Sequence, residues 1–271
     1  MAIKFNNVSY LDKLKNITYT FEKNKITSII GCSGSGKTLL SYLMTGLVLP
    51  TEGTVLIGDT KINNKTKKLK KIRKNIGYVF QNPEEQFFTN SVKEEIEFSF
   101  KNYEHTLDDS EEKIIKLLNK VGLDKTFLTR NPFSLSSGEK EKLALAIALS
   151  LEPEILILDE PTIYLDDKSI NELIDLLKEL QEKTKKTIII ISNDINFINK
   201  ITDNIVMLKN GKVNLKIPKD KFLDNIDKIK KNDIEIPKIL EFISMIEKNK
   251  NKKFNYTENI DKLVSEIKKN V

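Results

Sequence analysis

The residues best suited to chemistry stand in one run near the N-terminus. Gly31-Cys32-Ser33-Gly34-Ser35-Gly36-Lys37-Thr38 matches G-x-x-x-x-G-K-[ST], the pattern of phosphate-binding loops. Glycines let backbone N–H groups turn toward a polyphosphate, and the N-terminus of a following helix adds partial positive charge. Lys37 is placed for the β- and γ-phosphates of ATP, and Thr38 offers a hydroxyl to Mg2+. The run predicts a nucleotide site, although a Gly/Ser turn could match it by chance.

A second stretch with chemical potential ends in two carboxylates, Asp159 and Glu160. Four apolar residues, 155–158, precede them. This pattern predicts a central strand of a parallel sheet that delivers both acids at its carboxyl edge. Asp159 is suited to hold Mg2+, and Glu160 to orient and deprotonate a water for attack on the γ-phosphate. The less favoured alternative is that both acids only cap the next turn.

Three further positions could contact a nucleotide. Gln81 follows the predicted strand 76–80, where its amide can reach a metal or an attacking water. Ser136 and Gly138 stand in a Ser/Gly turn that opens the apolar helix 142–151, which makes a second anion site, although any N-cap serine looks similar. Tyr10 lies upstream of the phosphate loop and could stack on a base or be a half-buried strand residue.

Alternating strands and helices must position these residues. Strands are expected at 3–5, 17–21, 25–30, 53–58, 76–80, 155–158, 187–191 and 205–208, and helices at 38–44, 91–103, 110–121, 142–151 and 170–180. The order predicts an α/β fold with a β-rich N-terminal part and a mainly parallel sheet.

Composition limits the function classes. The net charge of +6 does not establish nucleic-acid binding, and the basic segment 61–74 lacks interleaved aromatics, so we interpret it as a solvated loop. The single cysteine, Cys32, excludes an internal disulfide. No apolar run approaches the roughly 20 residues that span a bilayer, which predicts a cytosolic chain. The single histidine, His105, is interpreted as an exposed link residue.

The order and spacing of these motifs resemble an ABC ATPase over residues 1 to about 212. The resemblance implies a P-loop domain over 1–212 with a helical insert at about 90–135. It also implies a head-to-tail dimer, in which Ser136, Gly138 and Glu139 of one chain close on ATP held by the other. Tyr10 would then stack on the base, Gln81 would serve the metal and the catalytic water, and Asp159 and Glu160 would keep the roles given above.

Two stretches narrow the resemblance to the ATPases of energy-coupling-factor (ECF) transporters. Residues 80–88 are similar to their F-Q-N-P-x-x-Q-[LIF]-F segment, in which the second glutamine, here Gln86, starts a short helix facing a transmembrane subunit. The tail, 213–271, resembles their small C-terminal, mainly helical domain, which contacts the dimer partner. One amphipathic helix is expected around 239–246 and a last one over 260–267.

Two positions depart from the family pattern. Asn193 stands after strand 187–191, where the family usually has a catalytic histidine, and Ser137 replaces a glycine of the Ser/Gly turn. A neutral amide cannot supply a charged contact to the γ-phosphate, and such contacts are about twice as strong as neutral ones. We therefore expect ATP binding to persist and hydrolysis at this chain's own site to be slow.

The resemblance implies the ATP-hydrolysing subunit of an ECF importer for vitamins or other micronutrients, at the cytoplasmic face of the membrane, with ATP and Mg2+ as cofactors. Its partners would be a second ABC ATPase, a transmembrane coupling protein and a substrate-binding membrane subunit, without nucleic acid. One alternative is the ATPase of another ABC importer. The other is a non-enzymatic subunit in which ATP only clamps the dimer. Glu160 argues against this second alternative, and Asn193 argues for it. A nucleic-acid-handling ABC protein is least favoured.

Overall fold

The computed structural model describes residues 1–66, 69–103, 110–250, 265 and 268 of the 271-residue chain. Its strands are β1 (Ile3–Tyr10), β2 (Leu14–Phe21), β3 (Ile26–Ile30), β4 (Glu52–Ile57), β5 (Thr60–Ile62), β6 (Ile76–Val79), β7 (Ile155–Asp159), β8 (Thr187–Ile191), β9 (Asn204–Lys209) and β10 (Lys212–Pro218). Its α-helices are α1 (Lys37–Thr45), α2 (Lys70–Arg73), α3 (Val92–Asn102), α4 (Ser110–Lys120), α5 (Ser137–Leu149), α6 (Asp167–Thr184), α7 (Ile195–Ile201), α8 (Ile226–Lys230) and α9 (Lys238–Lys250). Short 3-10 turns are η1 (Pro83–Gln86), η2 (Lys125–Phe127), η3 (Pro132–Ser134), η4 (Lys219–Lys221) and η5 (Leu223–Asn225).

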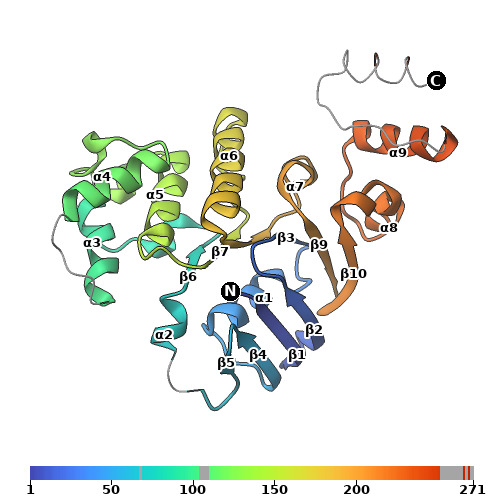
Figure 1. Ribbon diagram of the computed structural model, residues 1–271, viewed down its shortest axis with the longest axis horizontal. Coiled ribbons are helices and arrows are strands. Elements are labelled where there is room, and N and C mark those ends of the chain that lie inside the picture. Colours follow the sequence, from blue (N-terminus) through green and yellow to red (C-terminus); the bar gives the residue numbers. More distant parts are fainter. Residues whose placement is uncertain (67–68, 104–109, 251–264, 266–267, 269–271) are drawn as a thin grey trace.

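These strands form two sheets. The six-stranded main sheet has the order β10-β9-β3-β8-β7-β6 and is parallel except at β10. The four-stranded sheet β2-β1-β4-β5 is antiparallel. Helices α3 to α5 lie at one end of the main sheet and α8 and α9 at the other (Figure 1). The α/β fold with a β-rich N-terminal part is confirmed.

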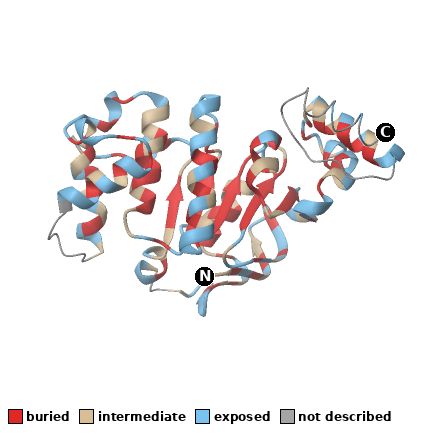
Figure 2. Cartoon of the chain, turned by 45° about the horizontal axis from the view of Figure 1, so that its top comes forward, coloured by how far each residue is buried: buried red, intermediate tan, exposed pale blue. Residues whose placement is uncertain are grey.

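The three central strands are buried along their whole length. Every residue of β3, β7 and β8 is buried, which is why each is a short unbroken apolar run in the sequence (Figure 2). Their register is the feature that matters for function. Ile29 of β3 and Asp159 of β7 both pair with Ile191 of β8, so the three strands end level with one another. The loops that follow them therefore meet at one edge of the sheet.

Hydrophobic side chains cover both faces of the main sheet. On one face, α5 and α6 bury residues such as Leu143 and Leu177 against Leu156 and Ile190. On the other face, α1 and the antiparallel sheet form a second cluster, which consists of Ile3, Phe5, Val8, Leu14, Ile17, Phe21, Ile29, Leu40, Leu43, Met44, Val55, Ile57, Ile62, Ile72, Tyr78, Ile155, Ile157, Ile189, Ile191 and Leu208. The sheet is thus packed on both faces, and its carboxyl edge carries the loops described below.

The boundaries of the predicted domains differ in one respect from the sequence-based expectation. Helices α3 and α4 fall inside the predicted insert at 90–135. The main sheet, however, continues past 212, because β10 pairs with β9 as far as Pro218. The predicted start of the C-terminal domain at 213 therefore falls inside a strand, and the helical segment begins at η4. The division into two domains stays a prediction.

His105 lies outside the described residues, and so does the last helix expected over 260–267 except for residue 265, which is helical. The helix expected around 239–246 is α9, which buries Leu240 and Ile243 and leaves Phe242 and Met245 exposed. Within the described part of the chain, no helix is long and apolar enough to cross a membrane.

Gly77 provides a test of how α5 is seated on the sheet. A Cβ at this position of β6 would lie 2.3 Å from the backbone oxygen of Ala148 in α5. Gly77→Ala must push the helix away, so we expect the free energy of unfolding to fall by about 1–3 kcal/mol. Urea denaturation followed by circular dichroism measures this change. An unchanged midpoint would contradict the close approach.

Candidate active site

The phosphate loop connects β3 to α1 and depends on its glycines. Gly31, Gly34 and Gly36 have φ angles of 153°, 75° and 102°. A Cβ on Gly31 would lie 2.5 Å from the backbone oxygen of Leu208, and one on Gly36 would lie 2.6 Å from Leu14 Cδ2. The loop conformation therefore requires glycine at both ends of the motif.

Lys37 lies across the loop that precedes it. Its ammonium donates hydrogen bonds to the backbone oxygens of Gly31 and Cys32. Burial lowers the pKa of Lys37, while the carboxylates of Glu160 and Asp159 act to raise it. The lysine is therefore a partly desolvated cation between the loop and the two acids, which is where a polyphosphate would bind.

Asp159 is the buried acid of the pair. Its side chain is 1% exposed, and Oδ2 accepts a hydrogen bond from the Tyr78 hydroxyl at 3.3 Å. The Thr38 hydroxyl lies close enough to the carboxylate to act against the rise of its pKa, and Oδ1 has no hydrogen-bond partner. Burial raises the pKa of Asp159. A buried carboxylate oxygen without a donor fits a cation, and oxygen ligands are what Mg2+ prefers, so Asp159 and Thr38 fit the expected metal.

Glu160 is held in a strained backbone conformation. Its φ is 51°, in the left-handed region, and its N–H donates to the backbone oxygen of Ile191 at 2.8 Å. Such strain costs of order 1–3 kcal/mol and concentrates at functional sites. Burial raises the pKa of Glu160, opposed by Lys37 and by hydrogen bonds from the Ser192 side chain and the Asn193 backbone. The Glu160 carboxylate, with its raised pKa, lines the cavity described below.

Asn193 contacts the phosphate loop directly. Gly31 N–H donates to Asn193 Oδ1 at 3.1 Å, and Asn193 Nδ2 donates to the Gly31 oxygen at 3.0 Å. The pairing follows from the register, since each residue stands two positions after the level pair Ile29 and Ile191. Sequence reasoning assigned Asn193 only to the γ-phosphate. The equal spacing after β3 and β8 was the signal that could have indicated this contact.

These groups line a cavity of about 830 Å³. Its lining residues are Asp12, Lys13, Lys15, Ser33, Gly34, Ser35, Gly36, Lys37, Thr38, Leu39, Tyr42, Gln81, Asp159, Glu160, Asn193, Asn210 and Gly211. Gln81 thus joins the two acids as expected, and Lys13 and Lys15 are cations that sequence reasoning missed. Tyr10 is not among the lining residues and packs against the core beneath the antiparallel sheet. Its role in base stacking stays a prediction.

The Ser/Gly turn lies apart from this cavity, at the start of α5. Ser136 Oγ accepts from Glu139 N–H at 3.3 Å, and Glu139 Oε2 accepts from Ser136 N–H at 2.8 Å. The Ser136 backbone hydrogen bond is the main reason why the pKa of Glu139 lies below its ordinary value. The two side chains thus form a capping box. The Glu139 side chain is therefore part of the helix cap. The Gly138 N–H lies in the first turn of α5.

The second glutamine differs from the sequence-based interpretation, because it ends a short helix and does not start one. Gln86 ends η1, and its Oε1 accepts from Phe80 N–H at 3.2 Å while Nε2 donates to the Tyr78 oxygen at 3.1 Å. The side chain therefore secures the end of β6. Phe87 is buried, whereas Phe88 is 58% exposed and stacks edge-on against Phe98, with ring centroids 4.4 Å apart.

The phosphate loop also contacts the C-terminal segment. Cys32 is half-buried, and its Sγ donates to the backbone oxygen of Asn232 at 3.0 Å. Ile30, at the end of β3, belongs to the same hydrophobic cluster as Ile226 and Ile229 of α8. The nucleotide loop and α8 therefore share one packing unit.

A glycine loop with Lys37 across it and two acids at the level ends of parallel strands define a P-loop nucleotide hydrolase. The ABC transporter family model matches residues 14–163, and the chain belongs to this family, whose members are ATPases.

Among its relatives is the energy-coupling factor transporter ATP-binding protein EcfA2 of Staphylococcus epidermidis, 36% identical over 94% of this chain and 93% of the relative. EcfA2 of Staphylococcus aureus is 36% identical over 89% of this chain and 88% of the relative. Among solved structures, cbiO1 of Clostridium perfringens, part of an ABC transporter complex, has a TM-score of 0.74 at 30% identity, covering 89% of this chain and 97% of its own. The dimeric cassette MJ0796 bound to ADP and Pi also has a TM-score of 0.74 at 30% identity, covering 80% of this chain and 98% of its own.

Asn193→Asp tests the contact with the phosphate loop. The substitution replaces the Nδ2 donor by an acceptor that faces the Gly31 oxygen and adds negative charge beside the phosphates. We expect ATP affinity to fall roughly tenfold or more, and Asn193→Ala to have a smaller effect, in titrations with a fluorescent ATP analogue. Asn196→Asp, on the exposed side of α7, is the matched control. Equal affinity of Asn193→Asp and the control would refute the role.

Proposed function

We propose that the chain is the ATP-hydrolysing subunit of an ECF importer for a vitamin or another micronutrient, at the cytoplasmic face of the membrane. The observation that carries the proposal is similarity to ECF ATP-binding proteins along 94% of the chain, far beyond the matched cassette residues 14–163. The C-terminal segment is thus part of the likeness. A second ATPase, a transmembrane coupling protein and a substrate-binding membrane subunit would complete the importer.

In this proposal the cavity holds ATP with its phosphates along the loop. Lys37 binds the β- and γ-phosphates, and Thr38, Asp159 and Gln81 hold Mg2+, which when bound neutralises phosphate charge. Glu160 takes the proton of the attacking water. It follows β7 directly and lines the cavity, and it is less buried than Asp159. Its raised pKa makes it a stronger base than an ordinary glutamate.

The partner's site would use the Ser/Gly turn of this chain. Ser136 and Gly138 stand at the N-terminus of the 13-residue helix α5, outside the cavity of their own chain. A helix N-terminus favours anions, so the turn suits the γ-phosphate of ATP held by a second ATPase. The MJ0796 cassette is dimeric with ADP and Pi bound, which supports a dimer of this chain with a second ATPase.

Asn193 favours slow turnover at the chain's own site. Its Oδ1 and one hydrogen of its Nδ2 are bonded to Gly31, so only the second, neutral Nδ2–H remains for a γ-phosphate. We infer that the partner's site hydrolyses ATP faster than this one. The same contact supports the alternative in which ATP serves mainly as a clamp here.

Glu160→Gln tests the chemical role. The variant keeps its shape but cannot accept a proton, so turnover should fall by roughly 10²–10⁴ while ATP still binds. Because the pKa of Glu160 is raised, the wild-type rate should fall on acidification at a higher pH than for an ordinary glutamate, and the variant should lose this dependence. Phosphate release measured across pH checks both. Turnover within about twofold of wild type would assign the base to another group.

Phe88→Ser tests docking on the transmembrane coupling protein. Phe88 and Phe98 form an exposed aromatic pair, the kind of apolar surface that marks an interface. The substitution should reduce co-purification with a co-expressed coupling protein while ATP binding and thermal stability persist. Phe87→Ser is the contrasting variant, because Phe87 is core, and it should cost about 3–5 kcal/mol of stability. Full assembly by Phe88→Ser would show that the pair is not the contact.

A further inference from the structure

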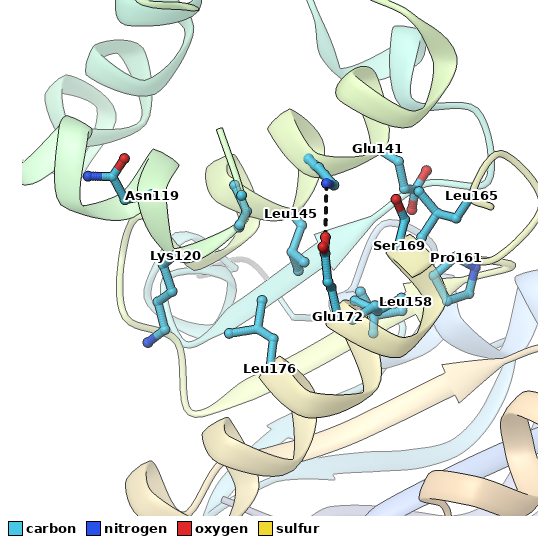
Figure 3. A pocket seen from close by; sticks show the side chains of 14 residues that line it. Asn119, Lys120, Glu141, Leu145, Leu158, Pro161, Leu165, Ser169, Glu172 and Leu176 are labelled. Atoms are coloured by element: carbon cyan, nitrogen blue, oxygen red, sulfur yellow. Dashed lines mark hydrogen bonds and ion pairs between the residues drawn. The ribbon is translucent and has the colours of Figure 1, made fainter. Parts of the chain in front are cut away.

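A second cavity lies apart from the candidate active site. It has a volume of about 220 Å³ and is lined by the C-terminal end of α4, by α5 and α6, and by the end of β7 and the residues that follow it (Figure 3). Its lining residues are Asn119, Lys120, Val121, Gly122, Glu141, Lys142, Leu145, Leu158, Pro161, Leu165, Ser169, Glu172, Leu173 and Leu176. Seven of these fourteen residues have apolar side chains, and no residue of the phosphate loop is among them.

Glu141 of α5 is the feature that the fold does not explain. It lines the cavity, its side chain is only 5% exposed, and no hydrogen bond or ion pair joins it to any residue of the described part of the chain. Burial alone raises its pKa to about 8. A largely buried carboxyl group that no protein group pairs with costs free energy, and a leucine would fill the same space without that cost.

The charges around Glu141 indicate which ligand would suit it. Lys142 also lines the cavity but pairs with Glu172 at 3.3 Å, the interaction that is dashed in Figure 3, and Lys120 of α4 is exposed. An anionic ligand would therefore meet two carboxyl groups and no free buried cation. A cationic ligand would give Glu141 the partner that the protein itself does not supply.

Size and lining restrict the ligand further. A cavity of about 150 Å³ lined by Leu, Ile and Phe is known to bind benzene, so about 220 Å³ accommodates one ring with a short substituent. Leucines from α5, β7 and α6, namely Leu145, Leu158 and Leu173, would cover the ring. Glu141, the acid that has no partner among the described residues, determines where the polar end of the ligand lies.

We propose that this cavity binds a small apolar amine, whose ammonium group pairs with the Glu141 carboxylate while its hydrocarbon body lies among the leucines. Near neutral pH the amine arrives protonated and Glu141 releases its own proton to solvent, so charge balances in the cavity. Affinity should therefore increase from about pH 6 to about pH 8, as the carboxyl group ionises more readily. The site goes beyond the proposed transport function and does not depend on it.

Calorimetric titration of the full chain with benzylamine and with benzyl alcohol tests the site. The two probes share a ring and differ in charge. We expect the wild type to bind benzylamine roughly tenfold or more tightly than benzyl alcohol, with a heat that depends on the ionisation enthalpy of the buffer. Glu141→Gln should lose this preference and still bind benzyl alcohol.

Leu176→Phe is the second variant, because it fills the cavity and leaves Glu141 in place. It should weaken the binding of both probes, and ATP binding shows that each variant is folded. Benzylamine binding that survives either variant unchanged places the amine elsewhere and overturns the proposal. Failure of the wild type to bind benzylamine saturably overturns it as well.

Discussion

The level endings of β3, β8 and β7 are the constraint on which the site depends. Because Ile29, Ile191 and Asp159 share one row of the parallel sheet, the residues that follow them emerge side by side. The phosphate loop, Glu160 and Asn193 are neighbours for this reason alone, although more than 120 residues separate the loop from the acids. A slip of one residue in either pairing would turn the side chains of that strand to the opposite face and separate these groups.

The same edge concentrates groups that oppose folding. Two carboxyl groups and the Lys37 ammonium are partly desolvated, and Glu160 carries a left-handed backbone. Since the pKa values of Asp159 and Glu160 are raised, the folded chain binds their protons more tightly than the unfolded chain does. Ionising both acids as the pH rises through these raised values therefore reduces stability. The apolar clusters on both faces of the sheet must offset this cost, which a polyphosphate and its metal would relieve.

Local patterns made much of this predictable from the sequence. The phosphate loop, the strand ending in two acids and the α/β order each depend on neighbouring residues, and the sequence displays them directly. The positions of Gln86, Phe87 and Phe88 could not be predicted in that way. Only tertiary packing decides that Gln86 bonds to the end of β6, that Phe87 enters the core and that Phe88 faces solvent. The contact between Asn193 and Gly31 and the continuation of β10 to Pro218 depend on strand pairing across long stretches of chain. The cavity at Glu141 requires four separate segments and has no local signature at all.

The hydrogen bond from Cys32 to Asn232 ties the C-terminal segment to the nucleotide loop, and Ile30 shares its core with α8. The segment is therefore a poor candidate for exchange as a module. A chimera that takes its cassette from this chain and its tail from a paralogue would have to re-create complementary surfaces beneath β3. Substitutions in the C-terminal segment must therefore stay compatible with those in the phosphate loop, and we expect the two regions to evolve together.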